Sequence, residues 1–236
     1  MSAGDAYSSP VNCLLTLGPG RSEAAARFTP DHVAWPDYPA ACGLGDKDVE
    51  PLVAMLDDLA LDQREGTMAW ARVHAYRALG QLKAGAAGTA LINAFNTAIM
   101  QKDARARAEL PVVLDMIGAS ICDPAIASLK DRSLDPYVHV VIASVLAGIG
   151  QARARLRPRC VQALMAALQH GSQNDPRLNS GLILSLKLLN TPKADKLIQQ
   201  VCRDGLADER MLQYALQDSS VVKAPAAAGR GPQSNP

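Results

Sequence analysis

Residues 73–82 read VHAYRALGQL and residues 89–95 read TALINAF, with an Ala- and Gly-rich turn between them. In both segments, apolar residues recur at the three- and four-residue spacing of a helix face. Segment pairs of this kind recur about every 35 residues. One apolar position from the first helix of each pair marks the period: Leu52, Leu91, Ile126, Ala163 and Leu197. Such a repeat is typical of stacked helical units that share one continuous core.

Residues typical of helix ends follow the same period. A proline stands at or near five predicted helix starts, where its missing amide hydrogen costs nothing: Pro124, Pro136, Pro158, Pro176 and Pro192. A glycine or asparagine marks the end of four second helices: Gly80, Gly118, Gly150 and Asn190. The predicted pairs are 48–59 with 67–82, 88–100 with 104–117, 124–130 with 136–149, 158–169 with 176–189, and 192–202 with 208–217. We predict an all-α fold, an α-solenoid of about five helical hairpins.

The chain divides into three predicted parts. Residues 1–45 are rich in proline and glycine but keep two apolar clusters, so we expect an irregular cap over the first hairpin. Disorder is the alternative for this segment. Residues 46–218 form the solenoid, with an acidic insert at 57–66 that lengthens the first hairpin's connection. Residues 219–236 lose the apolar periodicity and are predicted to be a disordered tail.

Composition excludes several classes of protein. Lysine and arginine total 24 against 23 for aspartate and glutamate, a net charge of +1. This balance is not that of a dedicated nucleic-acid or anionic-membrane binder. The longest apolar run, 138–149, is shorter than the roughly 20 residues that a membrane span needs, and the N-terminus does not resemble a secretory signal. We expect no membrane association and a cytoplasmic location.

Cysteine and histidine spacing gives no sign of a metal or catalytic centre. The five cysteines are scattered without a CxxC pair, which favours reduced thiols in a reducing compartment. The four histidines form no HExxH motif, and the chain lacks the GxSxG, GxGxxG and P-loop patterns. We therefore predict no metal, no cofactor, no catalytic residues and no enzymatic activity.

A candidate protein-binding site lies on the second helices. Trp70, His74 and Arg77 share one face of the 67–82 helix, opposite a stripe of small apolar residues that should pack inward. They should therefore face a groove or a seam between helices. Alignment of the terminal glycines adds Asp115 and Lys187 at the same position of later helices. We predict these five residues as partner-binding, since aromatic and arginine side chains dominate many protein interfaces. The structural alternative is an Arg77–Asp115 pair, with Trp70 packed on the cap.

Basic clusters offer a second hypothesis. The stretch 153–159, RARLRPR, places four arginines in seven residues, enough to contact a phosphate backbone: Arg153, Arg155, Arg157 and Arg159. A second cluster, KDARAR at 102–107, lies inside a hairpin, whereas 153–159 lies between hairpins. Because these two kinds of connection project at opposite edges of a solenoid, they should not form one basic patch. We therefore regard nucleic-acid binding as the alternative function.

Several motifs resemble those of HEAT-like repeat proteins, and more narrowly a group of uncharacterised bacterial proteins with PBS-lyase-type HEAT repeats. The motifs are WPDY at 35–38, GLG at 43–45 followed by LVAML at 52–56, VHAYRALGQL, ELPVVLDMIG at 109–118 and NDPRLNSGLI at 174–183. The resemblance covers roughly residues 11–205. It implies a HEAT-like solenoid that acts as an adaptor, an inhibitor or an immunity-type protein. A few relatives are bilin lyases or DNA glycosylases, but no residue here selects either chemistry, so a lyase-type enzyme is a third hypothesis.

Overall fold

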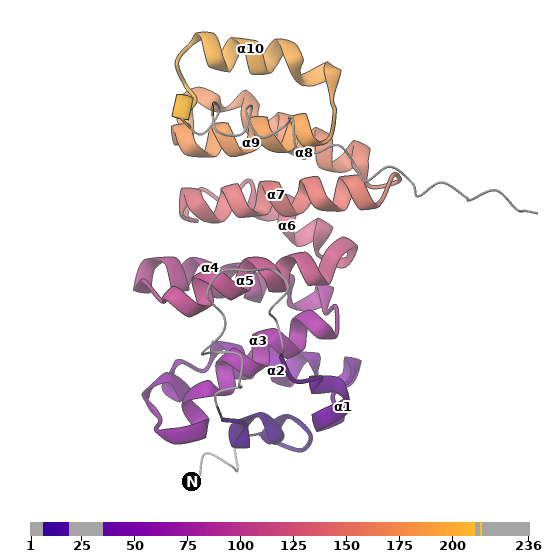
Figure 1. Cartoon of the computed structure of the whole chain (residues 1–236), viewed down its shortest axis with the longest axis vertical. Coiled ribbons are helices and arrows are strands. Elements are labelled where there is room, and N and C mark those ends of the chain that lie inside the picture. The colour runs from indigo at the N-terminus through magenta and orange to yellow at the C-terminus, as the bar shows by residue number, and fades with distance from the viewer. Residues whose placement is uncertain (1–6, 19–34, 211–212, 214–236) are drawn as a thin grey trace, which may run out of the picture.

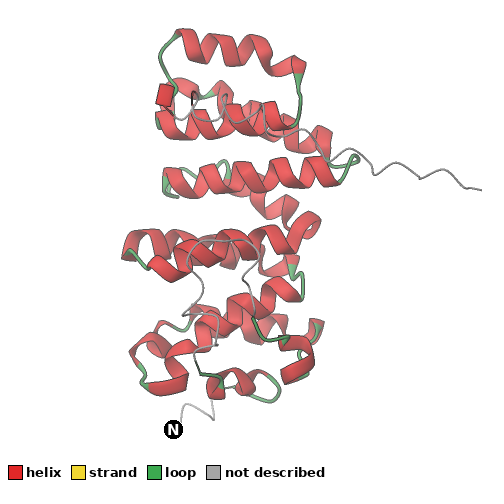
Figure 2. Cartoon of the chain, viewed as in Figure 1, coloured by secondary structure: helices red, strands yellow, loops and turns green. Residues whose placement is uncertain are grey.

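The computed structural model describes residues 7–18, 35–210 and 213. Within these residues every regular element is helical and none is a strand (Figure 2), which confirms the all-α prediction. A short N-terminal helix, α1 (Tyr38–Cys42), precedes two rows of longer ones. The first row is α2 (Val49–Asp57), α4 (Gly88–Gln101), α6 (Cys122–Ser128), α8 (Arg157–Gln169) and α10 (Asp195–Arg203). The second row is α3 (Ala71–Gln81), α5 (Ala104–Ile117), α7 (Pro136–Ala152) and α9 (Pro176–Leu188).

Successive helices of each row pack side by side. In the second row α3 contacts α5, α5 contacts α7, and α7 contacts α9; in the first row each helix from α2 to α10 contacts the next. Helices α2, α4, α6 and α8 also pack against the second-row helix that follows each of them. Figure 1 shows these pairs following one another along the long axis of the molecule. A continuous apolar core, which includes Leu52, Leu91, Leu164 and Leu182, lies between the rows.

The predicted helix limits agree with the structure in most places. Helix α5 has the predicted limits, and Gly118 follows it with a positive φ of 64°. Helix α7, however, continues past Gly150 to Ala152. A Cβ on Gly150 would lie 2.7 Å from Leu189 Cδ2, so this glycine permits close helix packing and does not end the helix. The predicted final helix, 208–217, lies largely outside the described residues.

The described parts of the N-terminal segment cover the first helix pair. A 3₁₀ helix, η2 (Val11–Thr16), and α1 pack against α3, and they bury Leu14 and Tyr38 completely. A disulfide between Cys13 and Cys42 joins η2 to α1. The described residues of this segment therefore lie against α3 through η2 and α1. Residues 1–6 and 19–34 of this segment, and the predicted tail at 219–236, lie outside the described residues.

The disulfide corrects the expectation that all five cysteines are reduced thiols. That expectation fails because Cys13 and Cys42, 29 positions apart, are brought together by the packing of the cap. Cys122 and Cys160 are buried, with their Sγ atoms 3.9 Å apart, and burial raises the pKa of Cys160 to about 12. Cys202 is exposed. Since disulfides are typical of oxidising compartments, the cysteines no longer support a reducing location.

One stretch meets the length and composition of a membrane span. Residues Ala104–Ser128 have a mean hydropathy of 1.5 over their most apolar window, of which 39% is buried. The backbone turns at Gly118, however, so the stretch comprises α5, a 3₁₀ turn and α6. Both α5 and α6 pack against α7. The core of a helical protein meets the same criterion, so this stretch is weak evidence for a membrane span.

Candidate functional site

Two of the five predicted partner-binding residues are buried. His74 is 0% exposed and Arg77 is 1% exposed, so neither can contact a partner at the surface of the folded chain. Helix α3 is enclosed because α2 and α5 cover part of it while η2 and α1 cover another part. The sequence left open a groove or a seam between helices, and the structure places His74 and Arg77 in seams, so they are not surface binding residues. The small apolar stripe of Ala71, Ala75 and Ala78 is buried as predicted.

His74 joins α3 to the cap through both ring nitrogens. Its Nε2 lies 3.2 Å from the carbonyl oxygen of Leu17, and its Nδ1 lies 2.7 Å from the hydroxyl of Tyr38. Because a carbonyl only accepts hydrogen bonds, we assign the hydrogen to Nε2, which leaves Nδ1 to accept from Tyr38. Burial, reinforced by the charge of Arg77, lowers the pKa of His74 to about 4. The imidazole is therefore neutral at pH 7.

Arg77 forms a two-pronged ion pair with Glu109 of α5. Its Nη2 lies 2.6 Å from Oε1 and its Nε lies 2.7 Å from Oε2, while the hydroxyl of Tyr76 donates to Oε2 at 2.9 Å. The guanidinium also lies 5.2 Å from the ring centre of Trp35 in the cap. Burial alone would lower the pKa of Arg77, but the bonds to Glu109 and its charge raise it above the usual value. The predicted partner, Asp115, is exposed and not part of this pair.

The neutral state of His74 predicts a loss of stability in acid. Below its ordinary pKa of about 6.5, the unfolded chain binds a proton on His74 that the folded chain does not bind until about pH 4. This residue should therefore cost about 2 kcal/mol of folding free energy between pH 7 and pH 5. Urea unfolding at a series of pH values would measure the loss, and His74→Gln should remove this contribution. Tyr38→Phe is a second test: it should lower stability at pH 7 and reduce the slope in part, because it removes a hydrogen bond that only the neutral imidazole accepts. An unchanged slope in His74→Gln would contradict the assignment.

Trp70 is half-buried at the end of a 3₁₀ helix, η7 (Gly66–Trp70), which contacts η2 of the cap. Its ring is covered on one face by the guanidinium of Arg105, whose Cζ lies 3.7 Å from the ring centre. A cation over an indole ring at this distance is a favourable contact. Trp70 therefore links the first hairpin to the start of α5 and is only partly available to a partner.

The outer face of the second row contains the two remaining predicted residues. Asp115 on α5 and Lys187 on α9 are both exposed. Between them lies α7, whose sequence PYVHVVIASVLAGIGQA has no charged residue. Its outward residues are exposed or half-buried: Tyr137, Val140, Val141, Ser144, Gly148 and Gln151.

Close contacts make this face continuous. A Cβ on Gly148 would lie 3.5 Å from Asp115 Oδ1, and the amide of Gln151 donates to the carbonyl of Leu188 at 3.0 Å. Val112 and Leu188 are 38% and 50% exposed at its two sides. We call this surface of α5, α7 and α9 the second-row face: α7 is its uncharged centre, with the exposed Asp115 on α5 at one side and the exposed Lys187 on α9 at the other.

The four arginines of the alternative hypothesis are all exposed, and two of them also contact the protein itself. Arg157 donates to the carbonyl of Leu189, and Arg159 pairs with Asp123 at 2.5 Å. Arg153 and Arg155 are exposed in the connection between α7 and α8. The structure thus places two of the four side chains in contacts with the protein itself.

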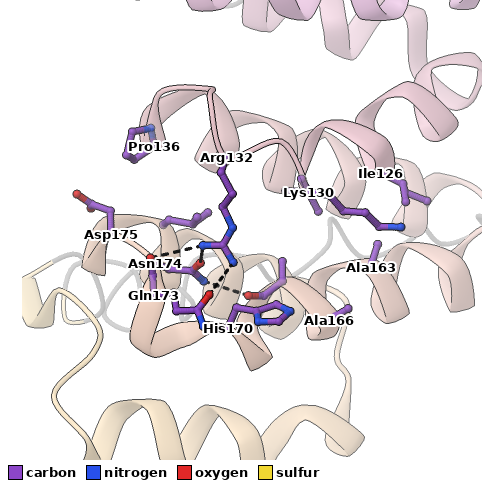
Figure 3. A pocket seen from close by; sticks show the side chains of 13 residues that line it. Ile126, Lys130, Arg132, Pro136, Ala163, Ala166, His170, Gln173, Asn174 and Asp175 are labelled. Carbon is purple, nitrogen blue, oxygen red and sulfur yellow. Dashed lines mark hydrogen bonds between the residues drawn. The ribbon is translucent and has the colours of Figure 1, made fainter.

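A groove that the sequence analysis did not predict lies between α6 and α8 (Figure 3). Cys122 of α6 and Cys160 of α8 lie side by side, with their sulfurs 3.9 Å apart. From this point α8 continues for nine residues but α6 for only six, so α6 is about one turn shorter. The missing turn leaves a cavity of about 410 Å³. The predicted range 124–130, the shortest of the first helices, was the one available signal.

The groove has an apolar floor and a polar rim. Ile126, Leu129, Ala163, Ala167 and Leu178 form much of the floor. Arg132 reaches across to Gln173 and Asn174, with nitrogen–oxygen distances of 3.3–3.5 Å (Figure 3). These acceptors are neutral and the bonds long, so the guanidinium can still bind a carboxylate. Lys130 and His170 are also exposed on the rim.

Among residues 7–18, 35–210 and 213, no group of three or more histidine, cysteine, aspartate or glutamate side chains could hold a metal ion. Comparison with protein-family models, with curated proteins and with solved structures finds no match for this chain.

Proposed function

We propose that the chain is an α-solenoid of HEAT-like hairpins and that it binds a protein partner, without catalysis, through the second-row face. The observation that carries the proposal is the uncharged surface of α7, exposed along the helix between Val112 and Leu188. Charged residues are depleted at the centres of protein interfaces, whereas the rims are polar. A helix of 17 residues without a charge, on an exposed face, fits such a centre.

The flanking residues supply the other parts of an interface. Val112 and Leu188 would add apolar contact area beside α7, while Asp115 and Lys187 would lie at the rim, where charges set orientation and association rate more than affinity. An adaptor, an inhibitor or an immunity-type protein would use this face in the same way. The arginine loop has less support, because Arg157 and Arg159 already contact the protein.

Ser144→Arg tests the proposal, because it puts a long cation at the exposed centre of the face. A tagged chain would be used to capture partners from native cell extract, with and without nuclease, and the proteins would be quantified by mass spectrometry. We expect a stoichiometric protein with the parent chain, and at least a tenfold loss with Ser144→Arg, since a desolvated unpaired charge costs well over 1.4 kcal/mol.

The matched control is Gln162→Arg, an equal change at an exposed position of α8 in the other row. It should capture the partner as well as the parent chain does. Circular dichroism must show the same helix content for both variants. Equal capture by Ser144→Arg, or recovery of nucleic acid in place of a protein, would refute the proposal.

A further inference from the structure

Exposed apolar side chains gather at one edge of the stack. The connections within hairpins lie along this edge, on the left in Figure 1, and we call it the turn edge: residues 58–70, 102–103, 129–135 and 170–175. Among the described residues five large apolar side chains are prominently exposed, and three lie in the turn edge or within two residues of it: Leu59 at 50%, Met100 at 70% and Tyr137 at 48%. Exposed apolar residues grouped in this way mark interaction surfaces.

The acidic insert and the rim of the α6–α8 groove differ in charge. The acidic insert, residues 57–66, has four carboxylates against one arginine around the exposed Leu59. Asp62 pairs with Arg72 and Asp58 accepts from the hydroxyl of Tyr7, whereas Asp57 and Glu65 are exposed. The α6–α8 groove has Lys130 and Arg132 on its rim, and its one lining carboxylate, Asp175, pairs with Arg177. Two further acids, Asp131 and Asp135, lie in the connection 129–135 between α6 and α7. Asp131 accepts bonds from Ser133, and Asp135 accepts from the backbone nitrogen of Tyr137 at the start of α7, and neither lines the groove.

The positions of insert and groove allow reciprocal contact between two copies. The insert belongs to the first hairpin, and the groove lies between the third and fourth hairpins on the same edge. If two copies lie edge to edge in opposite directions, the insert of each faces the groove of the other. A two-fold axis would then pass near the α4–α5 turn. At this axis Met100 would contact Met100 of the other copy, and Lys102 would contact Asp103 of the other copy.

We propose that the turn edge is the interface of a two-fold homodimer, in which Leu59 and the exposed carboxylates of each insert, Asp57 and Glu65, occupy the α6–α8 groove of the other copy. A strip of about three hairpins by two helix layers covers roughly 600 Å². This area is somewhat below the roughly 800 Å² per partner of a standard interface. The dimer should therefore dissociate in the micromolar range, on the order of 1–100 μM.

Charge reversal at two exposed positions tests the contact. Arg132→Glu reverses the charge of one side chain on the rim of the groove, and Asp57→Lys reverses the charge of one side chain of the insert. Asp57 is the last residue of α2, where a positive charge also interacts favourably with the helix dipole. In sedimentation velocity over a range of concentrations, the parent chain should form a dimer, and each variant alone should dissociate at least tenfold more readily. An equimolar mixture of the two variants should form a heterodimer of parental affinity, because every insert then faces a groove of opposite charge.

Controls separate this proposal from general effects of charge and from partner binding. Arg153→Glu and Leu188→Glu change an exposed arginine and an exposed leucine at the opposite edge, and both should leave the dimer intact. Ser144→Arg should also leave it intact, while Arg132→Glu should leave partner capture unchanged. A chain that stays monomeric at all concentrations, a mixture that does not associate, or growth into species larger than a dimer would each overturn the two-fold contact.

Discussion

Arg77→Met is expected to lower the free energy of unfolding by about 3–5 kcal/mol, because it removes one partner of a buried ion pair. Methionine keeps much of the apolar volume of the arginine stem, so the loss comes mainly from the charge that remains. Glu109 has a side-chain exposure of only 18% and would keep the hydrogen bond that it accepts from the hydroxyl of Tyr76. Urea unfolding followed by circular dichroism at pH 7 would measure the change.

Two further substitutions separate charge from geometry. Arg77→Lys keeps the charge but cannot bond both carboxylate oxygens in a planar fork, so we expect an intermediate loss. The double variant Arg77→Met with Glu109→Gln should recover part of the stability, since no charge is left unpaired. A loss below about 1 kcal/mol for Arg77→Met would show that the ion pair does not hold the first two hairpins together.

The double variant Cys13→Ser, Cys42→Ser is expected to lose about 3–4 kcal/mol, since the bond closes a loop over a sequence separation of 29 and limits the unfolded chain. The same loss should follow reduction of the parent chain with a thiol reagent. Unfolding midpoints in urea, with and without the reagent, would measure it.

Cys202→Ser is the matched control, because this cysteine is exposed and outside the disulfide. It should leave the midpoint unchanged and should still respond to the reagent. If the double variant were as stable as the parent chain under oxidising conditions, the disulfide would contribute nothing to the fold.

Local signals predicted helix limits well where both ends of a helix are marked in the sequence, as in α5. Asp103 accepts bonds from the backbone nitrogens of Arg105 and Ala106, and Gly118 takes the left-handed φ that follows α5, so both limits of this helix are encoded nearby. Asn190 has a φ of 45° after α9 for the same reason. The two-row packing then follows from the apolar faces of these helices.

The candidate site could not be predicted in the same way, because it depends on offsets between helices. Aligning Gly80 with Gly118 paired Arg77 with Asp115. In the structure, a Cβ on Gly80 would lie 3.2 Å from Val113, five residues before Gly118, and this offset brings Arg77 to Glu109. The burial of His74 depends on Tyr38 and Leu17, more than 30 residues away in an irregular segment. Helical periodicity contains no information about such a cover.

The short α6 also marks a place where the chain could be lengthened. One added helical turn after Ser128 would run beside the last turn of α8 and fill the cavity with the protein's own side chains. Related chains that carry such an insertion would therefore keep the hairpin and lose the groove. Chain length at this single turn would then distinguish molecules that have the pocket from molecules that do not.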